Sequence, residues 1–234
     1  MRRPALLLTV ALVAPLAGAQ TAPAPAVDSI AERTRACTAC HGKEGRATSE
    51  GYFPRIAGKP EGYLFNQLVH FRDGRRSNTA MTYLVQHLSD AYLREIAGYF
   101  ASLDLPYAAP APVSVAPAVL QRGEALALRG DAARQLPACV QCHGAALTGV
   151  APAVPGLLGL PRDYIVGQLG AWRSGQRRAH VPDCMAQISA RLAPEDVGAV
   201  AAWLASRPLP PMAKPLAAQP QPLPMPCGGN EAAR

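Results

Sequence analysis

Hydrophobic positions recur at helical spacing in two separate parts of the chain. From Gly62 to Phe71, aromatic and amide side chains return every four residues, just after a proline that suits a first helical turn. Ser89 followed by Asp90 provides an N-cap for a second helix, whose apolar residues lie three and four apart. Residues 162–172 and the run that starts at Pro194 repeat these two patterns. The residues expected to be buried are Leu93, Ile96, Ala97 and Phe100, and then Val197, Val200, Ala201 and Leu204. Since no long segment alternates between polar and apolar residues, the pattern predicts an all-α fold.

The two parts belong to an internal duplication. The hexapeptide Cys37-Thr38-Ala39-Cys40-His41-Gly42 returns 102 positions later as Cys139-Val140-Gln141-Cys142-His143-Gly144. Later matches continue at offsets of 101 and then 104, and the offset changes only where loops are expected. Those matches pair Pro54, Gly58, Tyr63, Gln67, Leu68, Arg72 and Gly74 with Pro155, Gly159, Tyr164, Gln168, Leu169, Arg173 and Gly175, and Met81, Leu88 and Tyr99 with Met185, Leu192 and Trp203.

The duplication predicts two tandem domains, residues 20–107 and 118–207, joined by a Pro/Ala linker at 108–117. Residues 208–234 are rich in proline, and we expect this tail to be extended rather than packed. Residues 1–19 are typical of a secretory signal that is cleaved near Ala19, which predicts export to the periplasm. Their apolar run of about 10 residues is too short to cross a bilayer, which needs about 20.

Composition leaves the two predicted cores short of large side chains. Of 234 residues, 45 are Ala, whereas only 4 are Phe, 7 Tyr and 2 Trp. Domains of about 90 residues are marginal without a staple, a metal or a cofactor. The formal net charge of +7 falls to +5 once Arg2 and Arg3 leave with the signal, and basic residues are not interleaved with aromatic ones. Composition therefore argues against a nucleic-acid partner and excludes a collagen, a coiled coil and a multi-span membrane protein.

The repeated C-x-x-C-H motif answers the question of what fills the cores. Cys37 and Cys40, like Cys139 and Cys142, are placed one helical turn apart, so their sulfurs can form thioethers with one porphyrin. The histidine that follows each pair is then directed towards the iron as a proximal ligand. A zinc ribbon needs its two cysteine pairs about 15–20 residues apart, and a thioredoxin-like pair needs a βαβ context. We therefore predict two covalently bound c-type haems, with His41 and His143 as iron ligands.

A second axial ligand is expected later in each half. Met81 and Met185 occupy matching positions, predicted to be loops between two helices, and a thioether opposite histidine favours electron transfer over ligand chemistry. Methionine is otherwise a common core residue. The competing ligands are His70, His87 and His180, of which His70 is better explained as a core or solvated histidine.

The motifs, taken in order, resemble the dihaem cytochrome c4 family. The resemblance covers residues 28–207. It rests on the duplicated C-x-x-C-H frame and on the segments Phe53-Pro54-Arg55-Ile56-Ala57-Gly58, Tyr63-x-x-x-Gln67-Leu68, Phe71-Arg72-Asp73-Gly74-Arg75-Arg76, Leu88-Ser89-Asp90 and Gly130-Asp131 with Pro137-Ala138-Cys139.

This resemblance implies two class I cytochrome c domains related by a pseudo-twofold axis, and periplasmic electron transfer rather than catalysis. The implied partners are redox proteins, with a cytochrome bc complex as donor and a terminal oxidase as acceptor, and at most peripheral membrane association. Two alternatives remain open. One is a subunit docked on a periplasmic dehydrogenase, with the tail as its tether; the other is a dihaem peroxidase, which needs an iron with an open distal site.

The resemblance also implies cofactor contacts for Arg55, Tyr63 and Tyr164, with Arg55 near a haem propionate. Gly156 occupies the position that matches Arg55 in the second half, so the two haems are expected to differ in potential. The helix before Cys37 is expected to be short, because only residues 28–36 are available to form it.

Two further features lie outside these motifs. Cys184 and Cys227 remain after the haem cysteines are assigned, and in an oxidising compartment we predict that they form a disulfide that pins the tail across the second methionine loop. Basic clusters also follow the first long helix of each half, and they are either solvated helix ends or contacts for haem propionates or an acidic partner. The clusters are Arg72, Arg75 and Arg76, and Arg173, Arg177 and Arg178.

Overall fold

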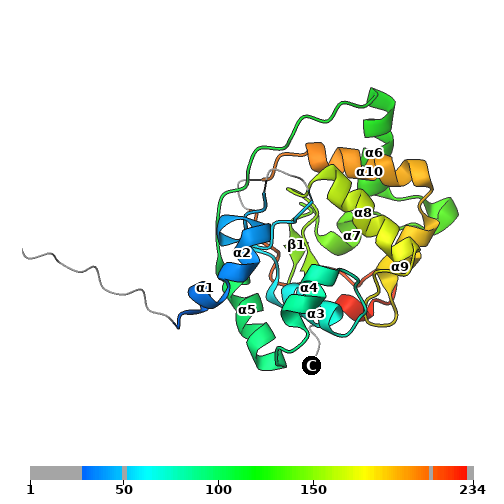
Figure 1. The fold of residues 1–234 in the computed structure, drawn as a ribbon. Coiled ribbons are helices and arrows are strands. Elements are labelled where there is room, and N and C mark those ends of the chain that lie inside the picture. The colour runs from blue at the N-terminus through cyan, green and yellow to red at the C-terminus, as the bar shows by residue number, and fades with distance from the viewer. Residues whose placement is uncertain (1–27, 49–51, 211–212, 231–234) are drawn as a thin grey trace, which may run out of the picture.

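The structure, a computed structural model, describes residues 28–48, 52–210 and 213–230. The described residues of the first half form α1 (Ile30–Arg33), α2 (Arg35–His41), α3 (Glu61–Arg72), α4 (Thr79–Val85) and α5 (Asp90–Ser102). Those of the second half form α6 (Pro117–Arg129), α7 (Val140–His143), α8 (Arg162–Arg173), α9 (Cys184–Arg191) and α10 (Pro194–Ser206). Short 3-10 turns occupy Lys43–Gly45, Ala132–Arg134 and Gly228–Asn230. Figure 1 shows the two groups of helices side by side.

The predicted helices form where the sequence places them. The Ser89 hydroxyl caps α5 by accepting a hydrogen bond from the Tyr92 amide, and α10 begins at Pro194, which has no amide proton to lose. All eight residues predicted to be buried in these two helices are buried. The fold is mainly α-helical as predicted, with one small hairpin that the sequence pattern did not indicate. In it β1 (Gly149–Val150) pairs antiparallel with β2 (Val154–Pro155).

Each half has its own hydrophobic core. The first core is built by α3 and α5 around Phe65, Leu93 and Phe100. In the second, α6 packs so closely on α10 that a Cβ at Gly123 would overlap the Ala199 carbonyl group. The short helix expected before Cys37 is α1, which is capped by the Ser29 hydroxyl and has far less surface to offer α5. The helix pair α1 and α5 of the first half is therefore much shorter than its counterpart, α6 and α10, in the second.

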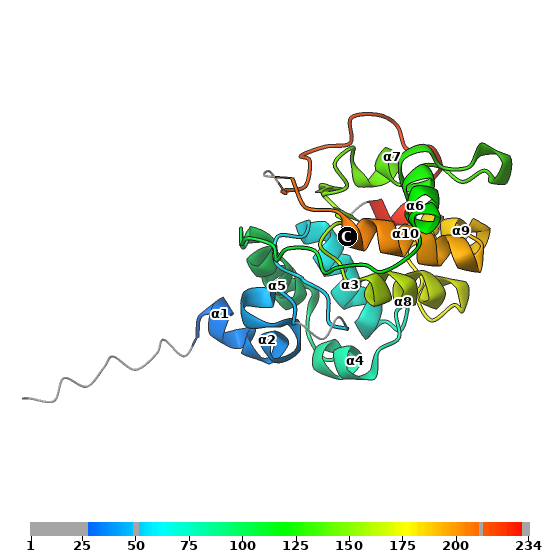
Figure 2. The same ribbon diagram turned by 90° about the horizontal axis from the view of Figure 1, so that it is seen from above.

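The two halves meet at a local twofold arrangement. Arg76 and Arg177 form an isolated antiparallel bridge. On one side of it the Ser77 amide donates to the Gln176 carbonyl oxygen at 2.8 Å, and on the other the Arg178 amide donates to the Arg75 carbonyl oxygen at 2.7 Å. Since matching segments of the duplication bond to each other, this bridge lies on the expected pseudo-twofold axis. Figure 2 shows α3 and α8 facing each other beside it.

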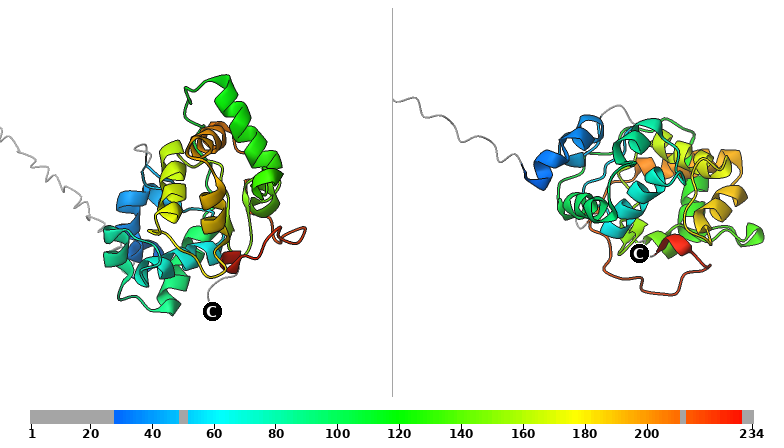
Figure 3. Two further views of the ribbon diagram at one scale, coloured as in Figure 1. Left: turned by 90° about the vertical axis from the view of Figure 1, so that its right-hand side faces the viewer. Right: turned by 60° about the horizontal axis from the view of Figure 1, so that its bottom comes forward.

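The tail departs from the sequence expectation. It is extended, but residues 213–230 are packed against the body of the protein rather than free of it. Its backbone bonds to β1 through Leu216, and its Lys214 ammonium pairs with the Asp104 carboxylate at 2.8 Å. The right-hand view of Figure 3 shows the tail, orange to red, following one edge of the molecule. Proline content predicted the extended backbone, but it gave no information about the surface that receives it.

The remaining predicted boundaries concern segments without regular structure. Between α5 and α6, residues 103–116 form neither helix nor strand, and Pro117 is already the first residue of α6. The predicted signal, residues 1–19, lies outside the described residues. Within the described part of the chain, no helix is long and apolar enough to cross a membrane.

Candidate metal centres

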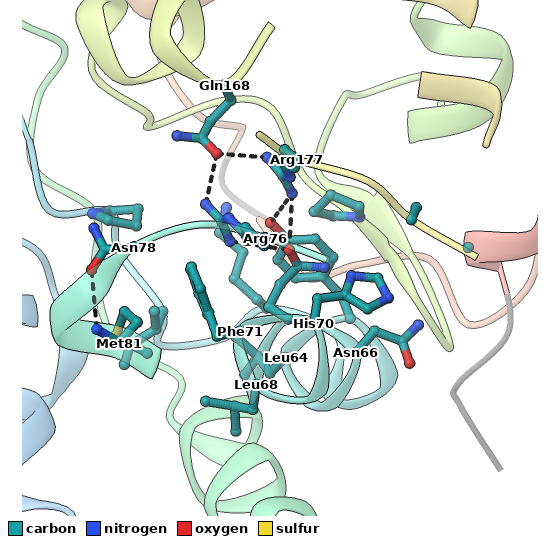
Figure 4. A pocket seen from close by; sticks show the side chains of 18 of the residues that line it. Leu64, Asn66, Leu68, His70, Phe71, Arg76, Asn78, Met81, Gln168 and Arg177 are labelled. Carbon is teal, nitrogen blue, oxygen red and sulfur yellow. Dashed lines mark hydrogen bonds between the residues drawn. The ribbon is translucent and has the colours of Figure 1, made fainter. Parts of the chain in front are cut away.

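One cavity connects the chemistry of the two halves. It has a volume of about 860 Å³. Its walls include both C-x-x-C-H motifs and both candidate methionines, through Cys37, Cys40, His41 and Met81 from the first half and Cys142, His143 and Met185 from the second. Cys139 does not line the cavity and packs against the second core. The other haem-motif cysteines, both histidines and both methionines line one shared space. Figure 4 shows part of this cavity, including Met81.

Both histidines are oriented with one ring nitrogen facing a carbonyl oxygen. Nδ1 of His41 lies 2.8 Å from the Pro54 carbonyl oxygen, and Nδ1 of His143 lies 2.7 Å from that of Pro155. A carbonyl oxygen only accepts, so each Nδ1 carries the proton and each Nε2 keeps its lone pair. Burial lowers the pKa of both histidines despite these bonds. The rings are therefore neutral, oriented and ready to ligate a metal through Nε2.

The cysteines are suited to covalent attachment rather than to thiolate chemistry. Burial raises the pKa of Cys37, and it raises the pKa of Cys139 to about 11. Reactive or zinc-binding cysteines need the thiolate, which such environments disfavour. No group of three or more metal-binding side chains from His, Cys, Asp and Glu gathers within the described ranges. The zinc-ribbon and redox-pair alternatives find no support.

Both methionines lie in short helices, so their prediction as loop residues is wrong. Met81 is in the first turn of α4, because the Asn78 side chain caps that helix by accepting from the Met81 amide at 3.0 Å. Met185 is in the first turn of α9, whose cap is Asp183. The cap fixes the backbone of the first turn, so it also fixes the direction in which the Met81 and Met185 side chains leave the helix. The two thioethers stay the predicted second ligands.

The competing histidines do not match this placement. His70 lines the cavity, but its ring contacts that of His180 across the junction of the two halves, with the ring centroids 4.9 Å apart and the planes tilted by 55°. It is 3% exposed, which agrees with its interpretation as a core histidine. Neither His87 nor His180 lines the cavity.

Two buried arginines form the polar centre of the cavity. Arg76 donates to Oε1 of Gln67 at 3.0 Å and of Gln168 at 2.7 Å, and Arg177 donates to the same two oxygens at 3.0 and 2.8 Å. Arg76 is 9% exposed and Arg177 6%, which contradicts the interpretation of these two as solvated helix ends. No carboxylate of the described residues pairs with either one. Figure 4 shows both guanidinium groups bonded to Gln168.

Tyr63 and Tyr164 belong to the same group of side chains. The Arg76 guanidinium donates to the Tyr164 hydroxyl at 3.0 Å, and that of Arg177 donates to the Tyr63 hydroxyl at 3.4 Å. Burial alone would raise the pKa of Tyr164, but the two arginines lower it. Both tyrosines line the cavity, and their cofactor contacts stay predictions.

Arg55 lines the cavity while its guanidinium is held by backbone. It donates to the carbonyl oxygens of Ala57 and Pro106, each at 3.1 Å, and to that of Leu105. The guanidinium also stacks on the Tyr107 ring, 3.8 Å from its centroid. Arg55 thereby fastens the chain that leaves α5, and a propionate contact for it stays a prediction.

Lys59 is a cation that sequence reasoning missed. Its ammonium is buried and donates to the carbonyl oxygen of Gly156 at 3.2 Å, so a side chain of the first half reaches the second half. Gly156 is the position that lacks a match for Arg55, and a Cβ there would crowd the Thr148 backbone. Burial, and then the charge of Arg55, lower the pKa of Lys59 to about 8. Leu160 occupies the position of the second half that matches Lys59. This difference between the repeats is the one sequence feature that could have drawn attention to Lys59.

Lys59→Met is expected to lower the potential of the second haem by an amount on the order of tens of mV. A buried positive charge favours the ferrous state, and the Lys59 charge already contributes to lowering the pKa of His143. The difference from the unmodified protein should shrink as the pH rises through the pKa of Lys59, because the ammonium then loses its charge. Spectroelectrochemical titration measures both effects. Lys214→Met, at an exposed lysine, is the control, and equal shifts in the two variants would exclude this role for Lys59.

The donor set fits covalently attached haem. It offers paired cysteines, a histidine with a free Nε2, a thioether on the same cavity, apolar walls, and buried cations that pair with no carboxylate of the described residues. Arg76 and Arg177 would hold propionate carboxylates, for which a buried guanidinium is a favourable partner. With two helical cores, the site defines a class I c-type cytochrome that has two haem sites.

Comparison with known proteins identifies the family. The chain is 40% identical over 175 residues to a thiosulfate dehydrogenase electron acceptor of Thiomonas intermedia, covering 75% of this chain and 80% of that protein. It is 36% identical over 170 residues to cytochrome c4 of Pseudomonas aeruginosa, covering 72% and 82% of the two chains. No protein-family model matches the sequence. The chain belongs to the cytochrome c4 family, and it is a dihaem electron-transfer cytochrome.

Solved structures agree. Reduced cytochrome c4 from Pseudomonas stutzeri superposes with a TM-score of 0.66 at 29% identity, over 76% of this chain and 96% of that one. Thiosulfate dehydrogenase (TsdBA) from Marichromatium purpuratum gives a TM-score of 0.68 at 34% identity, over 77% of this chain. The match spans only 39% of that longer chain. The predicted fold of two class I cytochrome c domains is confirmed.

Proposed function

We propose that this protein is a periplasmic electron carrier that accepts electrons from a dehydrogenase of inorganic sulfur compounds and delivers them to a respiratory acceptor. It is not itself the enzyme in this proposal. The observation that carries it is the single cavity, because both sets of axial-ligand candidates line one space. The donor is inferred from a relative named for accepting electrons from thiosulfate dehydrogenase and from the structural match to TsdBA.

The side chains of the chain have defined tasks in this function. Each haem iron, when bound, carries one electron by changing between its ferric and ferrous states. His41 and His143 present neutral Nε2 atoms whose direction is fixed by carbonyl oxygens, so the ligand need not reorganise when the charge changes. Met81 and Met185, which line the cavity, would supply the second ligand of each iron and exclude water from that position. The arginine pair supplies fixed positive charge between the two sites.

Two other functions are less well supported. The same fold also suits a carrier between a cytochrome bc complex and a terminal oxidase. That function differs from the proposed one only in the protein that donates the electrons. A dihaem peroxidase needs one open iron site. A methionine is placed on the cavity in each half, which favours two saturated irons over that chemistry.

The test mixes the oxidised holoprotein with thiosulfate, with and without a catalytic amount of purified thiosulfate dehydrogenase. We expect both haems to become reduced, as followed in the visible absorption bands, only when the dehydrogenase is present. Reduction by a cytochrome bc complex but not by the dehydrogenase would establish the first alternative instead. Peroxide turnover by the reduced protein would establish the second. Reduction of both haems by thiosulfate alone would contradict the need for a separate dehydrogenase as the electron donor.

A further inference from the structure

We propose that the C-terminal tail, residues 213–230, is a wall of the second haem site that covers its mouth and directs external electron exchange to the first. The proposal rests on the proposed function only in its consequence for partners, since the wall itself is a property of the fold. The tail follows the region that resembles the family, so the resemblance says nothing about it.

The tail is fixed at its beginning beside the second haem motif. The Leu216 amide donates to the Gly149 carbonyl oxygen at 2.9 Å, and the Leu216 carbonyl oxygen accepts from the Ala151 amide at 2.7 Å. The Leu216 side chain lies over Gly144, the residue after His143, where a Cβ would come within 3.3 Å of it. Further along, the Gln219 side-chain amide donates to the Gln141 carbonyl oxygen at 2.6 Å. Gln141 lies between the two haem cysteines of the second half.

The tail is fixed at its end beside the second methionine. The predicted disulfide is present between Cys227 and Cys184, the residue immediately before Met185. The Gly228 amide then donates to the Pro182 carbonyl oxygen at 2.9 Å. A Cβ at Gly228 would overlap the Val181 carbonyl group, so the backbone of the tail lies in close contact with the segment that leads into α9. The segment therefore runs from the cysteine side of the second site to its methionine side.

Between these two anchors, the tail contributes side chains to the cavity itself. Leu223 and Met225 line it, as do Cys227, Gly229 and Asn230. The first site shows no comparable cover among the described residues. There Tyr52 and Leu84, which also line the cavity, are 65% and 42% exposed. The two halves are thus unequal in the described part of the chain: the tail faces the second site, and no comparable segment faces the first.

The chemical consequence follows from replacing water by apolar side chains. A drier site disfavours the extra positive charge of ferric iron and raises the potential of the second haem. Covered on this face, the second haem exchanges electrons with the first haem rather than directly with external partners. Electrons from a donor would enter at the first site and collect at the second.

The experiment compares three full-length holoproteins. One is unmodified; one carries Cys184→Ser and Cys227→Ser, which releases the end of the tail; one carries Leu223→Ser and Met225→Ser, which keeps the disulfide and makes the wall polar. Potentiometric titration measures how the two haems share one electron. Cyanide binding to the ferric protein measures how easily each methionine is displaced. Neither measurement involves a dehydrogenase, so failure here is distinct from failure of the proposed function.

In the protein that holds one electron, we measure the ratio of molecules reduced at the first haem to molecules reduced at the second. In both variants we expect this ratio to rise at least threefold. In the released variant, cyanide binding at the second haem should also accelerate by at least tenfold, with the rate at the first haem unchanged. The polar-wall variant should bind cyanide at the unmodified rate, because Met185 remains pinned. Unchanged electron sharing in both variants, or equal acceleration at both haems, would overturn the proposal.

Discussion

Replacing the four cysteines of the two C-x-x-C-H motifs by serine is expected to give a chain without fixed tertiary structure. The chain would then have to maintain a cavity of about 860 Å³ with nothing attached in it. Part of this volume is open to solvent, but at about 24 cal/mol per Å³ even half of it left empty would cost roughly 10 kcal/mol. Net stabilities of whole domains are about 5–15 kcal/mol. Partial filling by water reduces this cost but does not restore the lost contacts, so the haems are structural as well as functional.

Near-ultraviolet circular dichroism and denaturant titration measure this effect. The matched control replaces the other two cysteines, Cys184 and Cys227, by serine. Those lie 43 residues apart, so their disulfide is expected to contribute about 4 kcal/mol by restricting the unfolded chain. The control should therefore remain folded, coloured and cooperative but less stable. A cooperative transition in the haem-free variant would contradict the proposed role of haem in the core.

Met185→Ala is expected to remove one of the two sulfur–iron bonds and to lower the potential of the second haem by an amount on the order of 100 mV. A thioether stabilises ferrous iron, and axial ligands are among the strongest determinants of haem potential. The weak near-infrared band that reports sulfur bound to ferric iron should fall to half of its intensity. Electronic absorption together with spectroelectrochemistry measures both changes.

Two matched variants make this test specific. Met81→Ala should remove the other half of the band and lower the other potential. Met225→Ala changes a methionine that lines the same cavity from the tail, and it should leave the band intact. If Met225→Ala removed the band while Met185→Ala did not, the ligand would come from the tail, and the assignment of Met185 would be wrong.

The sequence predicted what depends on local spacing. The helices α3, α5, α8 and α10 formed where apolar periodicity and capping placed them, because both act within a few residues of the chain. The C-x-x-C-H motif is equally local, so its cysteines and histidines could be named at once, and their roles in attaching haem and binding iron stay predictions. The Cys184–Cys227 disulfide was also predicted correctly, although by counting cysteines rather than by any local signal.

What the sequence did not show depends on contacts between distant segments. Arg76 was one basic residue in a cluster until the fold placed Gln168, which is 92 positions away, against it. Lys59 bonds across 97 positions to Gly156 for the same reason. The helical placement of Met81 was missed because a seven-residue helix with a single cap is too short for a periodic pattern. Repeats reveal which residues correspond, but not which ones touch.

Because Arg76 and Arg177 bond to glutamines of both halves, the two halves cannot be separated without loss of polar contacts. Each guanidinium bonds to a glutamine of its own half and to one of the other, so cutting at residues 103–116 would remove one of the two glutamine partners of each cation. A fragment with only the first half would also leave the Lys59 ammonium without its carbonyl acceptor. Neither half is therefore a ready-made single-haem module. A variant truncated to one half would first need replacements for these contacts between the halves.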